Sequence, residues 1–170
     1  VEAAKRLGDE YPHVIPHTIN VLDHPPSTSP TPGEARLATL ADTELVFKWL
    51  TRFCDEAVPH DDPPTPEEAQ KRIDSKRVYL WILDDAPVAM SCVGRVLETG
   101  VAIAPVYTPP ENRCRGFAGA ATAAIVNEAL GRGYRCAYLF TDDSNPASNR
   151  CYAKIGFRPY CKANMFLRKK

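Results

Sequence analysis

An anion-binding turn at residues 106–119 is the clearest chemical feature of this sequence. An apolar run that ends at Tyr107 is followed by a proline pair, by Arg113, Arg115 and Gly116, and then by small residues that favour a helix. The first backbone N–H groups of a helix have no partner within it, and the helix dipole is positive there. Arginines add positive charge, and glycine lets a phosphate approach the backbone closely. The order of strand, basic turn and helix therefore predicts a site for the phosphates of a ligand.

The spacing within this turn differs from that of the commoner phosphate loops. The sequence contains neither G-x-x-x-x-G-K-[ST] nor G-x-G-x-x-G. It contains R-x-x-G-x-A, formed by Arg113, Gly116 and Ala118. This pattern resembles the acyl-CoA pyrophosphate loop, R/Q-x-x-G-x-G/A, of the GNAT (Gcn5-related) N-acetyltransferases.

A second motif follows at residues 145–157, which read N-P-A-S-N-R-C-Y-A-K-I-G-F. Asn145 suits a helix N-cap, Pro146 suits the first helical position and Gly156 suits a helix end. The stretch resembles the GNAT element N-x-x-[SA]-x-x-x-Y-x-K-x-G-F. One helix, one turn and one strand separate the two motifs, as the family requires. The chain is therefore identified as a member of the GNAT family over roughly residues 34–168.

The apolar and turn patterns predict an α/β fold with a mixed sheet, in the order β-α-α-β-β-β-α-β-α-β. The expected strands are 35–38, 78–83, 87–96, 101–107, 136–141, 157–161 and 164–167, and the expected helices begin after Thr39 and at 65, 117 and 145. The resemblance implies the GNAT fold. Its central sheet splays between the strand ending at Tyr107 and the strand ending at Thr141, and the pantetheine arm lies in that gap.

The sequence divides at a proline-rich linker, residues 25–33. Residues 1–33 are expected to be an N-terminal extension with a helix-like start and a strand-like piece at 17–22, and they could be the remnant of a preceding domain. The GNAT acetyltransferase domain is expected at 34–170. Because the chain begins with Val1, it is expected to be processed or to be a piece of a longer chain.

Composition narrows the classes of partner. The 21 basic and 21 acidic residues give no net formal charge, so neither nucleic acid nor an anionic membrane is an expected partner. No apolar run has the length of a membrane span, and no signal-peptide pattern opens the chain, so a cytoplasmic protein is expected. It is expected to be a monomer or a homodimer. Six cysteines without C-x-x-C pairs indicate reduced thiols. His13 and His17 are separated by Pro16, which argues against a metal site on a shared helix.

Acetyl transfer needs an oxyanion donor and a proton for the leaving thiolate. The resemblance implies acetyl-CoA as cosubstrate and an amine, small-molecule or peptide, as acceptor, which attacks directly in a ternary complex. A backbone N–H near Val106 is the candidate oxyanion donor, and by resemblance Tyr152 is the general acid. From periodicity alone Tyr152 would be a packing aromatic. The base is open among Glu98, Glu56 and His60, and acceptor specificity is expected from residues 51–64 and the turn 95–100.

The acyl-CoA-binding residues implied by the resemblance are Val106, Tyr107, Thr108, Arg113, Cys114, Arg115, Gly116, Phe117, Ala118, Gly119, Asn145, Ser148 and Tyr152. Cys114 stands where the family commonly has glycine, and it is expected to be either a thiolate favoured by its cationic neighbours or an inert exposed thiol. Exposed arginines are often only solvated, so the backbone N–H groups are the stronger phosphate ligands. The alternative to an enzyme is a non-catalytic acyl-CoA-binding or interaction module on the same fold.

Overall fold

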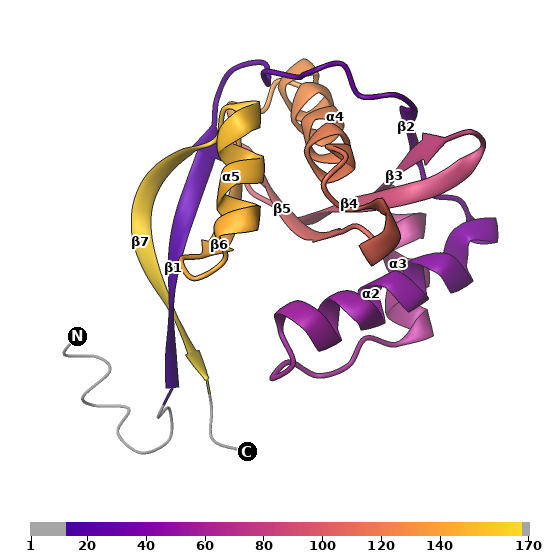
Figure 1. Ribbon diagram of the computed structural model, residues 1–170, viewed down its shortest axis with the longest axis horizontal. Coiled ribbons are helices and arrows are strands. Elements are labelled where there is room, and N and C mark those ends of the chain that lie inside the picture. Colours follow the sequence, from indigo (N-terminus) through magenta and orange to yellow (C-terminus); the bar gives the residue numbers. More distant parts are fainter. Residues whose placement is uncertain (1–12, 168–170) are drawn as a thin grey trace.

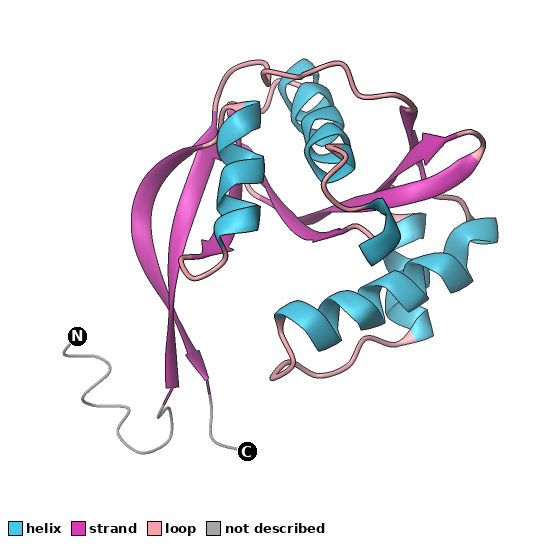
Figure 2. Cartoon of the chain, in the orientation of Figure 1, coloured by secondary structure: helices cyan, strands magenta, loops and turns pink. Residues whose placement is uncertain are grey.

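A seven-stranded mixed sheet organises the computed structural model, which describes residues 13–167 (Figures 1 and 2). The strands are β1 His13–Leu22, β2 Glu34–Leu37, β3 Val78–Leu83, β4 Ala86–Val96, β5 Gly100–Tyr107, β6 Cys136–Asp142 and β7 Arg158–Leu167. Their spatial order is β2-β3-β4-β5-β6-β1-β7, and only β5 and β6 pair in parallel. The predicted α/β fold with a mixed sheet is confirmed.

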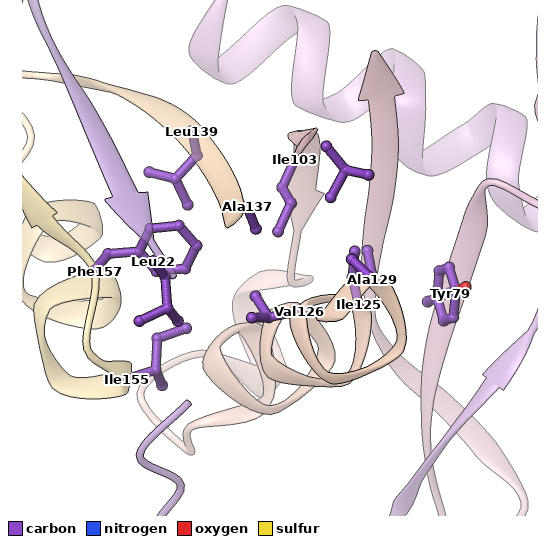
Figure 3. Close-up of a cluster of buried hydrophobic side chains, with 11 residues drawn as sticks. Leu22, Tyr79, Ile103, Ile125, Val126, Ala129, Ala137, Leu139, Ile155 and Phe157 are labelled. Carbon is purple, nitrogen blue, oxygen red and sulfur yellow. The ribbon is translucent and has the colours of Figure 1, made fainter. Parts of the chain in front are cut away.

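The helices cover the sheet on both faces. They are α2 Thr43–Ala57, α3 Pro66–Asp74, α4 Phe117–Gly131 and α5 Pro146–Ile155, with short 3-10 turns at Leu40–Asp42 and Pro110–Asn112. Figure 1 shows α4 and α5 on one side of the sheet and α2 and α3 on the other. One core cluster joins α4, α5 and the centre of the sheet, as the side chains of Figure 3 show, and a second lies between α2, α3, β3 and β4.

Local sequence signals explain where the helices begin. Thr65 Oγ1 accepts the Glu68 N–H at 3.2 Å while Glu68 Oε2 accepts the Thr65 N–H at 3.2 Å, a capping box that starts α3. Thr39 and Asp42 make the same arrangement ahead of α2. The β3–β4 hairpin turns at Asp84 and Asp85, both with positive φ. These predicted starts and this turn are confirmed.

The N-terminal strand differs from its sequence expectation. Residues 1–24 are expected to be an attachment, but β1 lies between β6 and β7 and pairs with both. A boundary at residue 34 would therefore cut the sheet. The sequence carries no signal for this pairing, because the partners lie more than a hundred residues away. The helix expected at residues 2–7 lies outside the described residues, and the origin of the segment in a preceding domain stays a prediction.

The C-terminal strand also differs in extent. Two final strands, 157–161 and 164–167, are expected, and one continuous strand, β7, is observed. Its pairing with β1 shifts register between Ile19 and Asn20, which leaves Tyr160 without a register partner. A bulge leaves one residue unpaired while the strand continues past it. The break expected at residues 162–163 is absent, because Lys162 pairs with Thr18 and Ala163 with His17.

Candidate functional site

The central strands part near the middle of the sheet. β5 and β6 pair only where Gly100–Ala102 meet Cys136–Tyr138. From Ile103 onward, β5 has no register partner on β6 within residues 13–167. Alternate residues of this free edge present backbone N–H and C=O groups to the gap, where an amide-bearing ligand can pair with them. The free edge of β5 ends at Val106 and Tyr107, and the basic turn begins directly after it.

The turn leads into the N-terminus of α4. Cys114 has φ of 62° and Gly116, the N-cap, has φ of 86°, so the backbone passes twice through the left-handed region. The first helical bond runs from the Ala120 N–H to the Gly116 carbonyl at 3.0 Å. The N–H groups of Phe117, Ala118 and Gly119 therefore have no acceptor within the helix. Such a helix end can bind an anion through the backbone alone.

The two helices that carry the motifs approach closely. A Cβ placed on Gly119 would lie 3.4 Å from Ile155 Cγ2 and 3.7 Å from Cys151 Sγ. These are ordinary contact distances, so α5 packs directly against the start of α4 at Gly119. This contact brings the Tyr152 segment beside the anion-binding turn.

Thr108 gives a test of whether a ligand fits here. Its Oγ1 is buried and has no hydrogen-bond partner among the described residues. A buried hydroxyl without a partner is costly, and it stands directly after the free edge of β5. This orphaned group, the free strand edge and the helix N-terminus suit the polar pantetheine and pyrophosphate groups of acyl-CoA.

The two arginines of the turn differ in what they contact. Arg113 Nη2 lies 2.5 Å from Glu56 Oε2, and its Nε donates to the Thr108 carbonyl at 2.9 Å. Arg115 is exposed and lies over the Phe117 ring, with Cζ 4.8 Å from the ring centroid. The Arg113 guanidinium is therefore engaged in holding the turn, which leaves Arg115 and the backbone as the better phosphate ligands.

Tyr152 lies half-buried on α5, with its ring edge-on to Phe157 at a centroid distance of 6.0 Å. Burial raises the pKa of the Tyr152 phenol far above its usual range, the charge of Cys151 adds to this, and a hydrogen bond with Ser148 opposes it. The phenol is thus protonated at neutral pH. Both sequence interpretations, packing aromatic and proton donor, are compatible with this environment.

The other motif residues of α5 take structural positions. Asn145 Oδ1 accepts the Ser148 N–H at 3.0 Å, so Asn145 is the N-cap as expected. Asn149 Nδ2 donates to the Asp142 carbonyl at 3.2 Å and ties the helix to the end of β6. These bonds fix the start of α5 next to the parting.

Long-range contacts on the far side of the parting were not predictable from spacing. The Tyr107 hydroxyl donates to Glu56 Oε1 at 3.3 Å, which joins the end of β5 to α2. Burial raises the pKa of Tyr107. His60 Nε2 lies 3.2 Å from Met165 Sδ, so the segment after α2 reaches β7. The sequence names Glu56 and His60 only as loose candidates, and nothing in it indicates Met165.

The turn 95–100, from which acceptor specificity is expected, lies at the other end of β5 from the motifs. It contains Glu98 and connects β4 to the beginning of β5. Val106 lies six residues further along the strand, about 20 Å away at 3.3 Å per residue. Glu98 and Val106 therefore lie at opposite ends of β5, which favours Glu56 and His60 over Glu98 as candidates for the base.

A surface hollow of about 190 Å³ lies away from the motifs, and Tyr79, Glu128 and Arg132 are among its lining residues. The Tyr79 hydroxyl donates to Glu128, which also pairs with Arg132. None of the predicted acyl-CoA-binding residues lines it, although Val96 of the turn 95–100 does. Across residues 13–167, no three His, Cys, Asp or Glu side chains are placed to hold a metal ion, and no helix is long and apolar enough to cross a membrane.

Comparisons with solved structures show the same fold. A GCN5-related N-acetyltransferase from Sphaerobacter thermophilus matches with a TM-score of 0.72 and 21% identity over 99% of this chain and 57% of that one. A GNAT-family protein from Novosphingobium aromaticivorans matches with a TM-score of 0.69 and 21% identity, over 92% of this chain and 65% of that one. An N-acetyltransferase from Staphylococcus aureus matches with a TM-score of 0.66 and 16% identity, over 81% of this chain and 100% of that one. The chain thus spans less than two thirds of the first two structures.

Comparison by sequence leads to the family. No protein of curated function matches the chain. The profile of the acetyltransferase (GNAT) family matches residues 43–157, which include the parted strand, the anion-binding turn and the Tyr152 helix. The match covers more than half of the chain, so this protein belongs to the GNAT family of acetyltransferases.

Proposed function

We propose that this protein is an N-acetyltransferase that moves an acetyl group from acetyl-CoA to an amine by direct attack in a ternary complex. The observation that carries the proposal is the parting of β5 and β6, which opens directly onto the N-terminus of α4 and lies beside α5. The parting suits a pantetheine amide chain, and the helix N-terminus suits a pyrophosphate. When bound, acetyl-CoA supplies the thioester that the amine attacks.

The chain's own groups then have distinct tasks. Backbone N–H groups of residues 116–119 hold the pyrophosphate, with Arg115 at its side. A backbone N–H near Val106 stabilises the oxyanion, and holding the reactants together lowers the barrier further. Tyr152 protonates the leaving thiolate. Its raised pKa supports this task, since the proton is present at neutral pH.

We propose that the amine enters on the side bounded by α2, residues 58–65 and β7. Glu56 and Tyr107 meet at the end of β5 there, and His60 meets Met165. These groups come from segments that are distant in sequence and surround one end of the parting. Glu56 and His60 remain the candidates for the base, and the acceptor is a small molecule or a peptide.

Release of free thiol from acetyl-CoA tests the activity. The protein is incubated with acetyl-CoA and a panel of primary amines and amino-terminal peptides, and the thiol is measured with a chromogenic disulfide. We expect release that depends on both the protein and one class of amine. Thermal unfolding with millimolar acetyl-CoA is run in parallel, because a ligand of the native state raises the melting temperature.

The two measurements together separate the enzyme from a binding module. A raised melting temperature with no thiol release for any amine would favour an acyl-CoA-binding module. If neither signal appears, the acyltransferase proposal fails.

A further inference from the structure

The proline-rich linker is fixed against the domain at both ends. The Ser27 N–H donates to the Ile155 carbonyl at the end of α5, at 3.0 Å. The Pro32 carbonyl accepts from Trp81 Nε1 at 2.9 Å. Gly33 follows with φ of 105°, and a Cβ there would lie 2.2 Å from the Ile82 carbonyl oxygen. In Figure 1 the linker runs from β1 past the ends of α5 and α4 to β2.

Between these fixed ends the linker passes the anion-binding turn. A Cβ built on Gly116 would lie 3.4 Å from Thr31 Oγ1 and 3.9 Å from Thr31 Cγ2, the two atoms within 4 Å of that position. Gly116 is the N-cap of α4. A hydroxyl from a segment more than eighty residues away in sequence therefore lies beside the N-cap residue of α4.

The present partner of this hydroxyl is replaceable. Thr31 Oγ1 donates to the Ser29 carbonyl at 3.2 Å, longer than the usual 2.7–2.8 Å of an O–H···O bond. A hydrogen bond to a phosphate oxygen is charge-assisted and about twice as strong as one between neutral groups. A phosphate at the start of α4 would therefore draw the Thr31 proton away from a weak local bond.

We propose that Thr31 is a further ligand of the coenzyme pyrophosphate, donating its hydroxyl hydrogen bond to a phosphate oxygen bound at the start of α4. The linker then forms a second wall of the phosphate site, opposite the helix. This inference rests on the proposed function, because the phosphate is that of acyl-CoA. It assigns a binding role to a segment that lies outside both sequence motifs.

Titration calorimetry with acetyl-CoA tests the inference on four proteins: wild type, Thr31→Val, Thr31→Ser and Thr28→Val. Valine keeps the shape of Thr31 and removes the donor, while serine keeps the donor. Thr28 is an exposed threonine of the same linker and serves as the matched control. We expect Thr31→Val to weaken acetyl-CoA binding by about tenfold, the usual worth of a hydrogen bond to a charged group. Thr31→Ser and Thr28→Val should bind acetyl-CoA within about twofold of wild type, since both keep a hydroxyl donor at position 31.

A truncated cosubstrate separates a phosphate contact from a change in linker packing. S-acetylpantetheine lacks the pyrophosphate, so Thr31→Val should leave its binding unchanged, measured by competition. Equal acetyl-CoA affinity in Thr31→Val and wild type overturns the inference. So does a loss of S-acetylpantetheine affinity in Thr31→Val that equals its loss of acetyl-CoA affinity, or a loss of acetyl-CoA affinity in Thr31→Ser that equals that of Thr31→Val. If wild type does not bind acetyl-CoA, the proposed function fails and this inference falls with it.

Discussion

The two sides of the parting between β5 and β6 are built in different ways. On the proposed coenzyme side, residues 106–119 place a free strand edge, a left-handed turn and a helix start within one short segment. On the proposed acceptor side, Glu56 meets Tyr107 and His60 meets Met165, across roughly 50 and 105 residues. The coenzyme side therefore depends on backbone geometry, while the acceptor side depends on side chains and on the placement of α2. Substitutions should affect the two sides separately.

The largest expected effect is that of Tyr152→Phe, at the proposed general acid. Removing the phenol hydroxyl removes the proton for the thiolate and little packing, so the turnover number should fall by roughly 10² to 10⁴. The affinity for acetyl-CoA should barely change, because the hydroxyl serves the chemical step. Because the pKa of Tyr152 is raised, its phenol stays protonated as the solution becomes alkaline. The wild-type protein should therefore keep its activity at moderately alkaline pH.

The control for this variant is its melting temperature, which should stay near that of wild type. Turnover at the wild-type rate would make Tyr152 a packing aromatic against Phe157, with the thiolate leaving unassisted or protonated by water.

A second expected effect is confined to the coenzyme side. Gly116→Asp places a negative charge at the helix start and a Cβ 3.4 Å from Thr31 Oγ1, so acetyl-CoA affinity should fall by about tenfold or more. Gly133→Asp is the matched control, because Gly133 has a similar φ of 90° and nothing within 4 Å of its added Cβ. Both variants bear a similar backbone strain of about 1 kcal/mol. Equal acetyl-CoA affinity in the two would mean that the phosphates bind elsewhere.

A third, smaller effect is expected on stability, at the start of α2, the helix of the proposed acceptor side. Asp42 accepts hydrogen bonds from Arg36 Nη1 and Nη2 at 2.7 and 2.8 Å, and from the Thr39 N–H just before α2. The hydrogen bond from Arg36 lowers the pKa of Asp42 to about 2, against burial. Asp42→Asn should lower the free energy of unfolding by about 2 kcal/mol at neutral pH.

The sign of the pH dependence follows from that lowered pKa. The stabilisation is fully present above the unfolded pKa of about 4 and is lost as pH falls towards about 2. Urea unfolding of wild type and Asp42→Asn should therefore differ at pH 7 and converge near pH 2, with acetyl-CoA affinity unchanged at pH 7. A difference that persists at the lowest pH would show that the bonds to ionised Asp42 are not its cause.

The same contrast explains how far the sequence could predict the molecule. Arg113, Gly116 and the N-cap Asn145 belong to contiguous motifs whose backbone roles follow from residue type, and the family and the mixed α/β sheet followed from them. The place of β1 between β6 and β7 did not, because strand pairing at long range leaves no local signal. The Arg113–Glu56 pair was missed for the same reason, since the sequence indicates only a phosphate ligand at Arg113.

The most direct test of the account is a crystal structure of the protein with CoA. We expect the pyrophosphate on the N–H groups of residues 116–119, the pantetheine arm along β5 from Ile103 to Tyr107, and the sulfur within hydrogen-bond reach of the Tyr152 hydroxyl. Thr31 Oγ1 should then face a phosphate oxygen. A CoA molecule bound away from the parting, or one whose sulfur lies on the far side of the sheet from Tyr152, would contradict the account.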